Sequence, residues 1–335
     1  MTTDADAPQV DAQAEGGAGT EIKAVPARHP GRWVGTIIVL YLLFALIHAA
    51  ATNPRFNWGV VTKNLFDGFV LHGVVNTLWL TFLSMVVGVI LGTVLAVMRL
   101  SPVRIISGAA WVYIWFFRGT PVYVQLLFWG SIAALTGKYV NIQVPLTGIV
   151  VVPNILTIHL IPPLVAAVLG LGLNEGAYMA EIVRAGILSV GEGQSEAAAS
   201  LGMTRLKTLR LVVLPQAMRV IVPPTGNETI GMLKTTSLVG ATIAYPELLY
   251  VVTQVYVVTF QIIPWLLIAS IWYLIMTSVL TFGQYYVERY YARGSTRNLP
   301  PTPFQRLRAL FARNLTTTHA PEAKGPLGPP LSEAR

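Results

Sequence analysis

Long runs of uncharged apolar residues are the main feature of this sequence. Residues 248–287 contain no Asp, Glu, Lys or Arg, and neither do residues 73–98. A helix that crosses a membrane needs about 20 predominantly apolar residues, because the hydrocarbon core is roughly 30 Å thick and each residue adds about 1.5 Å. Only 11% of the 335 residues are charged, against roughly 25% in soluble domains. The chain is therefore expected to be an all-α, polytopic membrane helix bundle.

The apolar runs predict about six transmembrane helices. They begin near Trp33, Gly73, Ile105, Ile155, Val220 and Pro264. Arg118, Gly119, Thr120 and Pro121 interrupt the third run. Residues 250–260 are also apolar and precede the sixth run, so we expect them to form a re-entrant or interfacial segment.

The positions of the basic residues predict the orientation. The chain has 23 Lys and Arg and a net charge of +8. If the N-terminus is inside, eighteen of the 23 fall in cytoplasmic segments, three (Arg55, Lys63 and Lys138) fall outside, and Arg118 and Lys234 lie within the runs. Cytoplasmic loops carry an excess of Lys and Arg. We therefore expect a multi-pass plasma membrane protein with both termini cytoplasmic, and the basic charge needs no nucleic acid as partner.

The loop between the fourth and fifth runs has a pattern typical of two short helices joined by a turn. Gly193 or Ser195 can start a helix that the following alanines continue. Gly202 can adopt the left-handed conformation that ends it, and Thr204 can cap a second helix. Pro215 then resets the chain before the next span. The sequence thus predicts a helix–turn–helix elbow facing the cytoplasm.

Three interpretations of this elbow compete. It is an ordinary helical connector, a DNA-binding helix-turn-helix, or a docking site for another subunit. A DNA-binding unit needs a third helix in a soluble core, whereas here apolar runs begin close to the elbow on either side. The DNA-binding interpretation is therefore disfavoured.

The docking interpretation rests on a family resemblance. The segment resembles the EAA loop of permease subunits of ABC importers. In that loop Glu-Ala-Ala is followed after three residues by glycine, after nine more by an aliphatic residue, and then by Leu-Pro. The matching residues here are Glu196, Ala197, Ala198, Gly202, Val212, Leu214 and Pro215, with Val212 where isoleucine is usual. The resemblance implies that the elbow couples the chain to a separate ATPase.

Other segments resemble the polar amino acid branch of that family. They are residues 117–121 with Gln125, residues 178–186, residues 214–217, residues 223–224 and residues 234–238. The resemblance covers residues 70–293, which would form a five-helix permease core. Residues 33–52 would be an extra N-terminal transmembrane helix, residues 1–32 a disordered cytoplasmic leader and residues 294–335 a flexible cytoplasmic tail. The implied partners are a pair of ABC ATPase subunits, a second permease (identical or homologous), an extracytoplasmic amino-acid-binding protein and membrane lipid.

Ionisable residues within the runs are candidates for the translocation path, because a charge in hydrocarbon usually faces a cavity or a partner. Glu181 and Arg184 share a helix face and either pair with each other or serve transport. Asn227 and Lys234 also share a face, and Lys234 either contacts a substrate carboxylate or holds a neighbouring span. Glu228 and Lys234 lie on opposite sides of their helix.

Two more candidates lie in the third run. Arg118 either binds a substrate carboxylate through a bidentate contact or anchors the chain near the cytoplasmic interface. Gln125 follows the break and completes the candidate path. In the second run, Asn76, Thr77 and Thr81 form a polar stripe that predicts interhelical hydrogen bonds.

The sequence carries no signature of an enzyme. It contains no Gly-x-x-x-x-Gly-Lys-Ser/Thr loop and no cysteine. We therefore expect no cofactor or metal bound by this chain, and ATP hydrolysis by a partner subunit. The predicted function is the membrane-spanning translocation subunit of an ATP-driven importer for polar amino acids. The alternative is an ATP-independent secondary transporter or channel for small polar solutes.

Overall fold

The computed structural model describes residues 30–132, 137, 139–143, 150–156, 159 and 161–291. Residues 1–29 of the predicted leader and the whole predicted tail lie outside these residues. The chain divides into two compact units, and the boundary along the chain falls between Phe56 and Asn57.

The first unit contains helix α1 (Pro30–Thr52) and a 3₁₀ turn (Pro54–Phe56). Helix α1 forms where the extra N-terminal helix was predicted. Its side chains from Val34 to Ala49 are all exposed, and most are apolar. A helix that is apolar on every side requires lipid or another helix around it. That this helix is an extra transmembrane helix outside the permease core stays a prediction.

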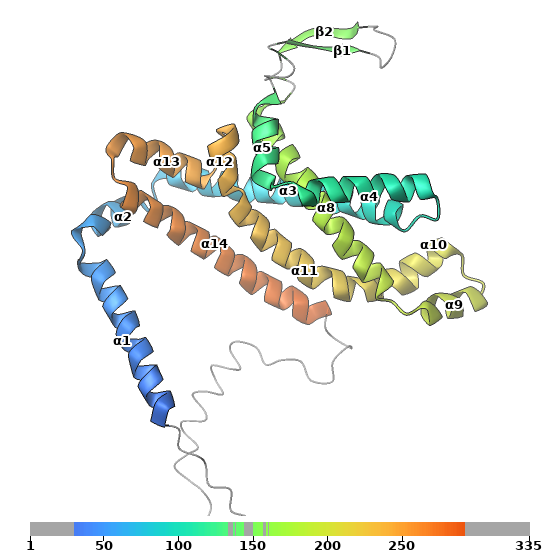
Figure 1. Cartoon of the computed structure of the whole chain (residues 1–335), viewed down its shortest axis with the longest axis horizontal. Helices are drawn as coiled ribbons and strands as arrows, with labels where there is room; N and C mark the ends of the chain where they lie inside the picture. The colour runs from blue at the N-terminus through green and yellow to red at the C-terminus, as the bar shows by residue number, and fades with distance from the viewer. Residues whose placement is uncertain are drawn as a thin grey trace, which may run out of the picture. The chain divides into compact units, whose positions relative to one another are not determined.

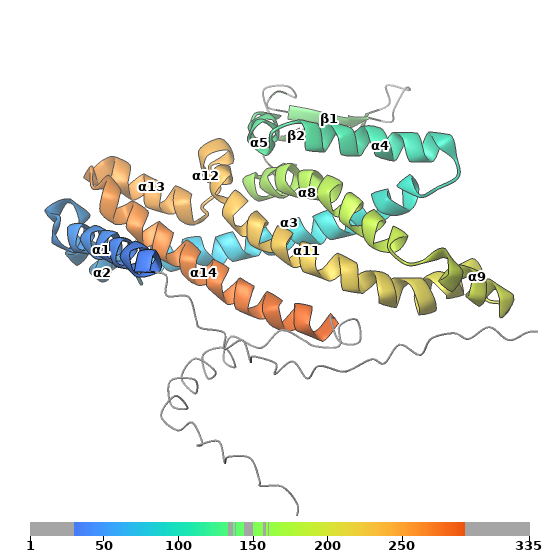
Figure 2. The ribbon, with the colours of Figure 1, turned by 60° about the horizontal axis from the view of Figure 1, so that its bottom comes forward.

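The second unit holds the remaining elements (Figures 1 and 2). Its longer helices are α3 (Gly68–Arg99), α4 (Arg104–Gly119), α8 (Pro163–Leu188), α11 (Leu214–Thr235), α13 (Leu248–Thr259) and α14 (Ile262–Tyr291). Its shorter elements are α2 (Trp58–Asn64), α5 (Val122–Gly130), β1 (Tyr139–Gln143), β2 (Val150–Leu156), α9 (Glu192–Ser200), α10 (Arg205–Thr208) and α12 (Ser237–Ile243). Helix α8 packs between α3 and α11, and α11 packs on α14.

The structure confirms the polytopic helical bundle. In the described residues, four helices are long and apolar enough to span a membrane: α1, α3, α8 and α14. A fifth span results if α12 and α13, bent by 61°, are counted as one broken span. The count stays below the predicted six because Gly119–Pro121 breaks the third run into α4 and α5, and because α11 carries charged and amide side chains. The bend before α13 agrees with the predicted re-entrant or interfacial segment.

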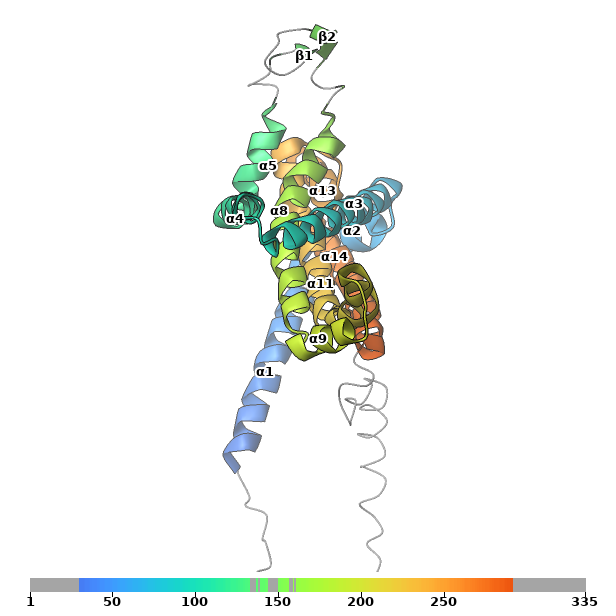
Figure 3. The ribbon, with the colours of Figure 1, turned by 90° about the vertical axis from the view of Figure 1, so that its right-hand side faces the viewer.

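Two boundaries differ from the sequence prediction. The fourth span begins at Pro163 rather than near Ile155, because Pro162 and Pro163 fix the backbone at the start of a helix. The preceding β-branched residues instead form β2, which pairs with β1 as an antiparallel hairpin. The hairpin projects beyond α5 and the first turn of α8 (Figures 1 and 3). The fifth helix starts at Leu214 rather than Val220.

Four glycines let α3 and α8 pack closely. Gly88 and Gly92 lie one turn apart on α3, and Gly172 and Gly176 lie one turn apart on α8. A Cβ added at Gly92 would lie 2.9 Å from the backbone nitrogen of Ala180. Glycines spaced four apart are typical of tightly packed membrane helices, because they bring two backbones into contact. We name these four residues the glycine seam.

Candidate functional site

The first half of the predicted elbow is helix α9. It begins at Glu192, with Gly191 as N-cap, rather than at Gly193 or Ser195. It ends at Ser200, and Gly202, two residues later, has the predicted left-handed conformation with a φ of +74°. The Gly202 N–H donates to the Ala199 carbonyl (2.9 Å), and the Met203 N–H donates to the Ala198 carbonyl (3.1 Å). These two bonds form a Schellman motif, which fixes the direction of the chain after the helix.

The second half of the elbow leads directly into α11. The Thr204 hydroxyl oxygen accepts a hydrogen bond from the Lys207 N–H (3.4 Å), so Thr204 caps α10 as predicted. A π-helical segment, Leu209–Val213, follows without a break. Pro215 then lies in the first turn of α11, directly after the π-helical segment, so its missing N–H falls where the hydrogen bonding changes from the π to the α pattern. A movement of α9 and α10 would therefore act on α11 through continuous helical backbone.

The elbow presents apolar side chains to its surroundings. Leu201, Leu206 and Leu211 are 82%, 74% and 64% exposed. Ala198 is buried against the rest of the elbow, while Glu196 and Ala197 are exposed. Three exposed leucines on one short segment are typical of a surface that another protein covers. Helix α10 continues through the π-helical segment into α11, so the second helix of the elbow is the start of a bundle helix rather than part of the separate soluble unit that carries a DNA recognition helix.

The break between α4 and α5 is stabilised by two amide side chains. Pro121 has no N–H, which leaves the Phe117 carbonyl without its usual helical partner. The Gln125 amide donates to this carbonyl (3.1 Å), and so does the Asn174 amide from α8 (2.8 Å). Gln125 also donates to the Thr120 hydroxyl (2.7 Å). Gln125 therefore holds the broken helix in place, and its Oε1 is buried without a partner among the described residues.

A polar cluster forms where α4, α8 and α11 meet. The Arg118 guanidinium lies over the Tyr178 ring, 5.1 Å from its centroid. The Glu228 carboxylate attracts the Arg118 guanidinium and repels the Glu175 carboxylate at longer range, and among the described residues no hydrogen bond or ion pair joins these three side chains. The structure thus brings together two predicted residues, Arg118 and Glu228. It adds two that were not selected, Glu175 and Tyr178.

Glu175 is the most deeply buried member of the polar cluster. It is 4% exposed, and its Oε1 has no hydrogen-bond partner among the described residues. Its side chain packs against Gly88 in the glycine seam. A buried carboxylate oxygen without a partner is energetically costly.

The other predicted path residues lie apart from the polar cluster. Glu181 forms the predicted ion pair with Arg184, with Oε2 and Nη2 2.7 Å apart. The side-chain amide oxygen of Asn227 (Oδ1) accepts a hydrogen bond from the Gln284 side-chain amide of α14 (3.1 Å). Lys234 is exposed near the end of α11. Arg118 lies about 21 Å along α4 from Arg104, at the rise of about 1.5 Å per residue, and both roles considered for Arg118 stay predictions.

Glu247 fixes the bend before α13. It is fully buried, and its carboxylate accepts hydrogen bonds from the Leu249 N–H (2.8 Å) and the Tyr250 N–H (2.6 Å). The Tyr273 hydroxyl of α14 donates to the same carboxylate (3.0 Å). The predicted interhelical bonds of α3 form here as well: Asn76 donates to the Pro246 carbonyl, and Thr77 accepts from the Leu248 N–H. Thr81, in contrast, donates to a carbonyl of its own helix.

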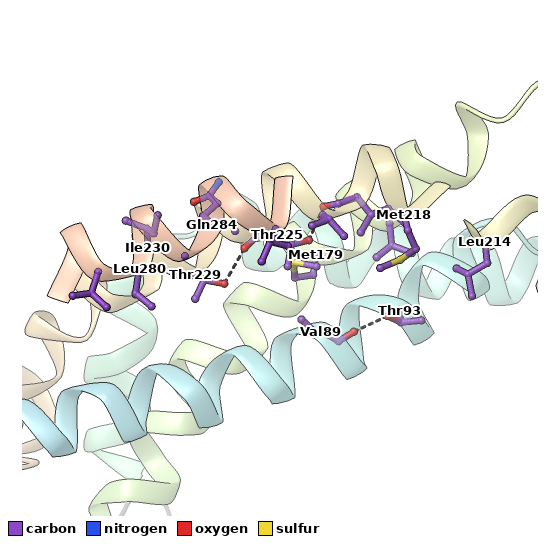
Figure 4. A pocket seen from close by; sticks show the side chains of 17 residues that line it. Val89, Thr93, Met179, Leu214, Met218, Thr225, Thr229, Ile230, Leu280 and Gln284 are labelled. Atoms are coloured by element: carbon purple, nitrogen blue, oxygen red, sulfur yellow. Dashed lines mark hydrogen bonds between the residues drawn. The ribbon is translucent and has the colours of Figure 1, made fainter. Parts of the chain in front are cut away.

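An open apolar groove of about 640 Å³ runs along α3, α8, α11 and α14 (Figure 4). The polar side chains along it are Thr93, Thr225, Thr229 and Gln284. The hydroxyls of Thr93 and Thr229 donate to carbonyls of their own helices. The surface of the groove therefore offers few polar groups to a solute.

A family model for the inner membrane component of binding-protein-dependent transport systems matches residues 88–293. This range includes the whole elbow, the polar cluster and α14. The chain belongs to this family. It is a multi-pass inner membrane permease, and such a transport system has a separate ATPase subunit and a binding protein.

Curated permeases resemble this one over most of their length. The arginine transport system permease ArgU of Corynebacterium glutamicum is 48% identical over 278 residues, which cover 83% of this chain and 85% of the relative. The histidine/lysine/arginine/ornithine transport system permease HisM of Escherichia coli is 37% identical over 214 residues, which cover 64% of this chain and 85% of the relative.

Solved permease structures share the fold. A chain in the crystal structure of an amino acid ABC transporter with histidines superimposes with a TM-score of 0.57 at 35% identity, covering 68% of this chain and 97% of that chain. The MetNI methionine ABC transporter in an inward-facing conformation has a TM-score of 0.50 at 20% identity and shows the fold alone. The ATP-independent transporter considered from the sequence is therefore set aside.

The permease has two functional candidates that the sequence reading passed over. Glu175 stands in an apolar run, three residues before Tyr178 and six before Glu181, and a lone acid in such a run is itself a signal of function. Glu247 follows Pro246 at the start of a helix, where an acidic side chain commonly caps the free N–H groups.

Proposed function

We propose that this permease is the translocation subunit of an importer for basic amino acids. The observation that carries the proposal is the pair of carboxylates, Glu175 and Glu228, in the polar cluster. The buried, unpartnered oxygen of Glu175 suits a cationic side chain or an ammonium group. The names of the two relatives, which specify arginine and histidine/lysine/arginine/ornithine, support the same substrate class.

The remaining residues of the proposed path have separate tasks. Arg118, held over Tyr178, is placed to meet the substrate carboxylate, because a guanidinium binds a carboxylate in a bidentate manner. Gln125 supports the helix break beside it. Asn227, Glu181 and Lys234 hold neighbouring helices or line the route toward either end of the bundle.

We further propose that the elbow faces the cytoplasm and docks on the ATPase. The excess of Lys and Arg on that side supports this orientation. In Figures 1 and 2 the α3–α4 turn, which carries Arg99 and Arg104, lies toward the same end of the bundle as α9. Both termini would then be cytoplasmic, and the coupling residues would be Glu196, Ala197, Ala198 and Gly202 with Val212, Leu214 and Pro215.

A second permease, identical or homologous, would cover the apolar groove of Figure 4. The groove is open and apolar along its length, as expected of a surface that packs against the helices of a second membrane subunit. Two ATPase subunits would bind the two elbows, and an extracytoplasmic binding protein would deliver the amino acid. This chain would bind no ATP and no cofactor itself.

The test is uptake of labelled amino acids by the complete transporter in liposomes. We expect ATP-dependent uptake of arginine and lysine, and little uptake of glutamate. Glu175→Gln should raise the arginine concentration for half-maximal uptake about tenfold, because one charge-assisted contact contributes about 1.5–3 kcal/mol. Asp67→Asn is the matched control, since Asp67 is exposed at the start of α3 and its side chain makes no capping bond.

The outcomes separate the parts of this proposal. Glutamate uptake as fast as arginine uptake would contradict the substrate class while leaving the permease function intact. If Glu175→Gln leaves the arginine concentration for half-maximal uptake unchanged, Glu175 does not contact the substrate. Uptake of no amino acid at all would overturn the proposed function.

A further inference from the structure

A polar cavity of about 410 Å³ lies at the turn between α3 and α4, away from the polar cluster and the groove. Its lining residues are Arg99, Ser101, Pro102, Arg104, Ser107, Gly108 and Trp111. None of them is acidic. The cavity therefore combines two positive charges with two hydroxyl groups.

The structure holds Arg99 toward this cavity. Arg99 Nη1 donates to the Ser107 hydroxyl (2.9 Å), and that hydroxyl donates to the Arg99 carbonyl (3.0 Å). This exchange closes the turn and leaves other guanidinium N–H groups available. Among the described residues, no carboxylate forms an ion pair with Arg99 or Arg104. The ion pair that these residues do contain joins Glu181 and Arg184, outside the cavity. A guanidinium with free N–H groups and no carboxylate partner can bind a phosphate through two parallel hydrogen bonds.

The surface around the cavity is apolar. Ile105 is 83% exposed, and Trp111 and Trp115 are also exposed, with their rings stacked 6.3 Å apart. On α3, Val97 is exposed beside the turn. Tryptophan is enriched where membrane and water meet, and Arg reaches from that depth toward headgroups. The cavity thus lies at the boundary between an apolar belt and the end of the bundle.

We propose that this cavity binds the phosphate of an anionic phospholipid. Arg99 and Arg104 would hold the phosphate, and Trp111 would lie against the glycerol and upper acyl chain. The apolar side chains beside the cavity favour a lipid over a free phosphate ion, because a soluble anion gains nothing from them. The proposed orientation places the site in the cytoplasmic leaflet, which carries anionic lipids. The proposal rests on that orientation and is independent of the substrate carried.

Native mass spectrometry of the full chain in detergent tests this site. Phosphatidylglycerol or phosphatidylcholine is added, and the lipid retained on the protein is measured. We expect retention of phosphatidylglycerol over phosphatidylcholine. R99Q/R104Q should lower phosphatidylglycerol retention about tenfold or more, because each Arg near an anionic headgroup contributes about 1 kcal/mol. R205Q/R210Q is the matched control, since it likewise removes two Arg charges from the same end of the bundle, at positions that do not line the cavity.

If the R99Q/R104Q variant unfolds, the conservative variant R99K/R104K is measured instead. It retains both charges but loses the planar fork, so its retention should fall between the native chain and R99Q/R104Q. Equal retention of the two lipids, or an equal loss in R205Q/R210Q, would overturn the site. Displacement of phosphatidylglycerol by millimolar inorganic phosphate would overturn the lipid and assign the cavity to a soluble anion.

Discussion

At the scale of single residues, the glycine seam explains how a polar residue reaches the middle of this bundle. Gly88 leaves room for the Glu175 side chain, and Gly176 leaves room for Leu91. Without a hydrophobic driving force between helices in lipid, such close backbone contacts are a main source of helix association. The glycine seam therefore stabilises the α3–α8 pair and also positions the carboxylate that we assign to the substrate path.

Gly92→Ala should destabilise the permease by about 1–3 kcal/mol, the usual cost of overpacking a well-packed contact. The added Cβ would collide with backbone atoms of Met179 and Ala180, which cannot rotate away. The measurement is denaturant or thermal unfolding of the purified chain in detergent, followed by circular dichroism.

Gly231→Ala is the matched control for this prediction. Gly231 is also inside a long helix, but an added Cβ would meet no atom within 4 Å. The control should be neutral or more stable by up to about 1 kcal/mol, because alanine favours the helix over glycine. Equal behaviour of the two variants would show that the seam does not hold α3 and α8 together.

At the scale of elements, the elbow was the part most fully predictable from sequence. Gly202 and Thr204 act through neighbours within four residues, so their local chemistry determines the turn. The path residues were less predictable, because Arg118 and Glu228 come together only through the packing of α4, α8 and α11. The same limit applies to Glu247, whose partner Tyr273 lies 26 residues away.

The boundaries of two elements were missed for a different reason. An apolar run does not distinguish a strand from the start of a helix, so the fourth span was predicted to begin near Ile155, inside the last residues of β2. Pro162 and Pro163 were the sequence signal for the start of α8 at Pro163. Likewise, the π-helical segment Leu209–Val213 joins the elbow to α11 without the break that the sequence suggested at Pro215.

Gly202→Val should uncouple the elbow from the ATPase. A β-branched residue at a φ of +74° is strained, so the Schellman motif would open and α9 would lose its fixed direction. We expect co-purification of the ATPase with the permease to fall about tenfold, while the chain keeps its circular dichroism spectrum. Gly59→Ala, in a helix with ordinary contacts around it, is the control. Unchanged ATPase binding by Gly202→Val would refute the coupling role of the elbow.

At the scale of the whole molecule, the orientation links the proposals to one another. The elbow can meet an ATPase, and the α3–α4 cavity can meet anionic lipid, only if both face the cytoplasm. Lys and Arg are enriched in cytoplasmic loops, and labelling of single introduced cysteines tests each end of the bundle directly. The natural sequence contains no cysteine, so single cysteines can be introduced without further changes.

Three exposed positions report on the orientation: Ser200 on α9, Gln261 between α13 and α14, and Asn53 after α1. A membrane-impermeant maleimide should label Asn53→Cys and Gln261→Cys in intact spheroplasts, but Ser200→Cys only after permeabilisation. The labelled fraction is read from a gel shift, with a denatured sample of each variant as the reference for complete labelling. Labelling of Ser200→Cys in intact spheroplasts would reverse the orientation and with it the coupling and lipid sites. Protection of Asn53→Cys alone would show that α1 does not cross the membrane, and it would leave the orientation of the permease core unchanged.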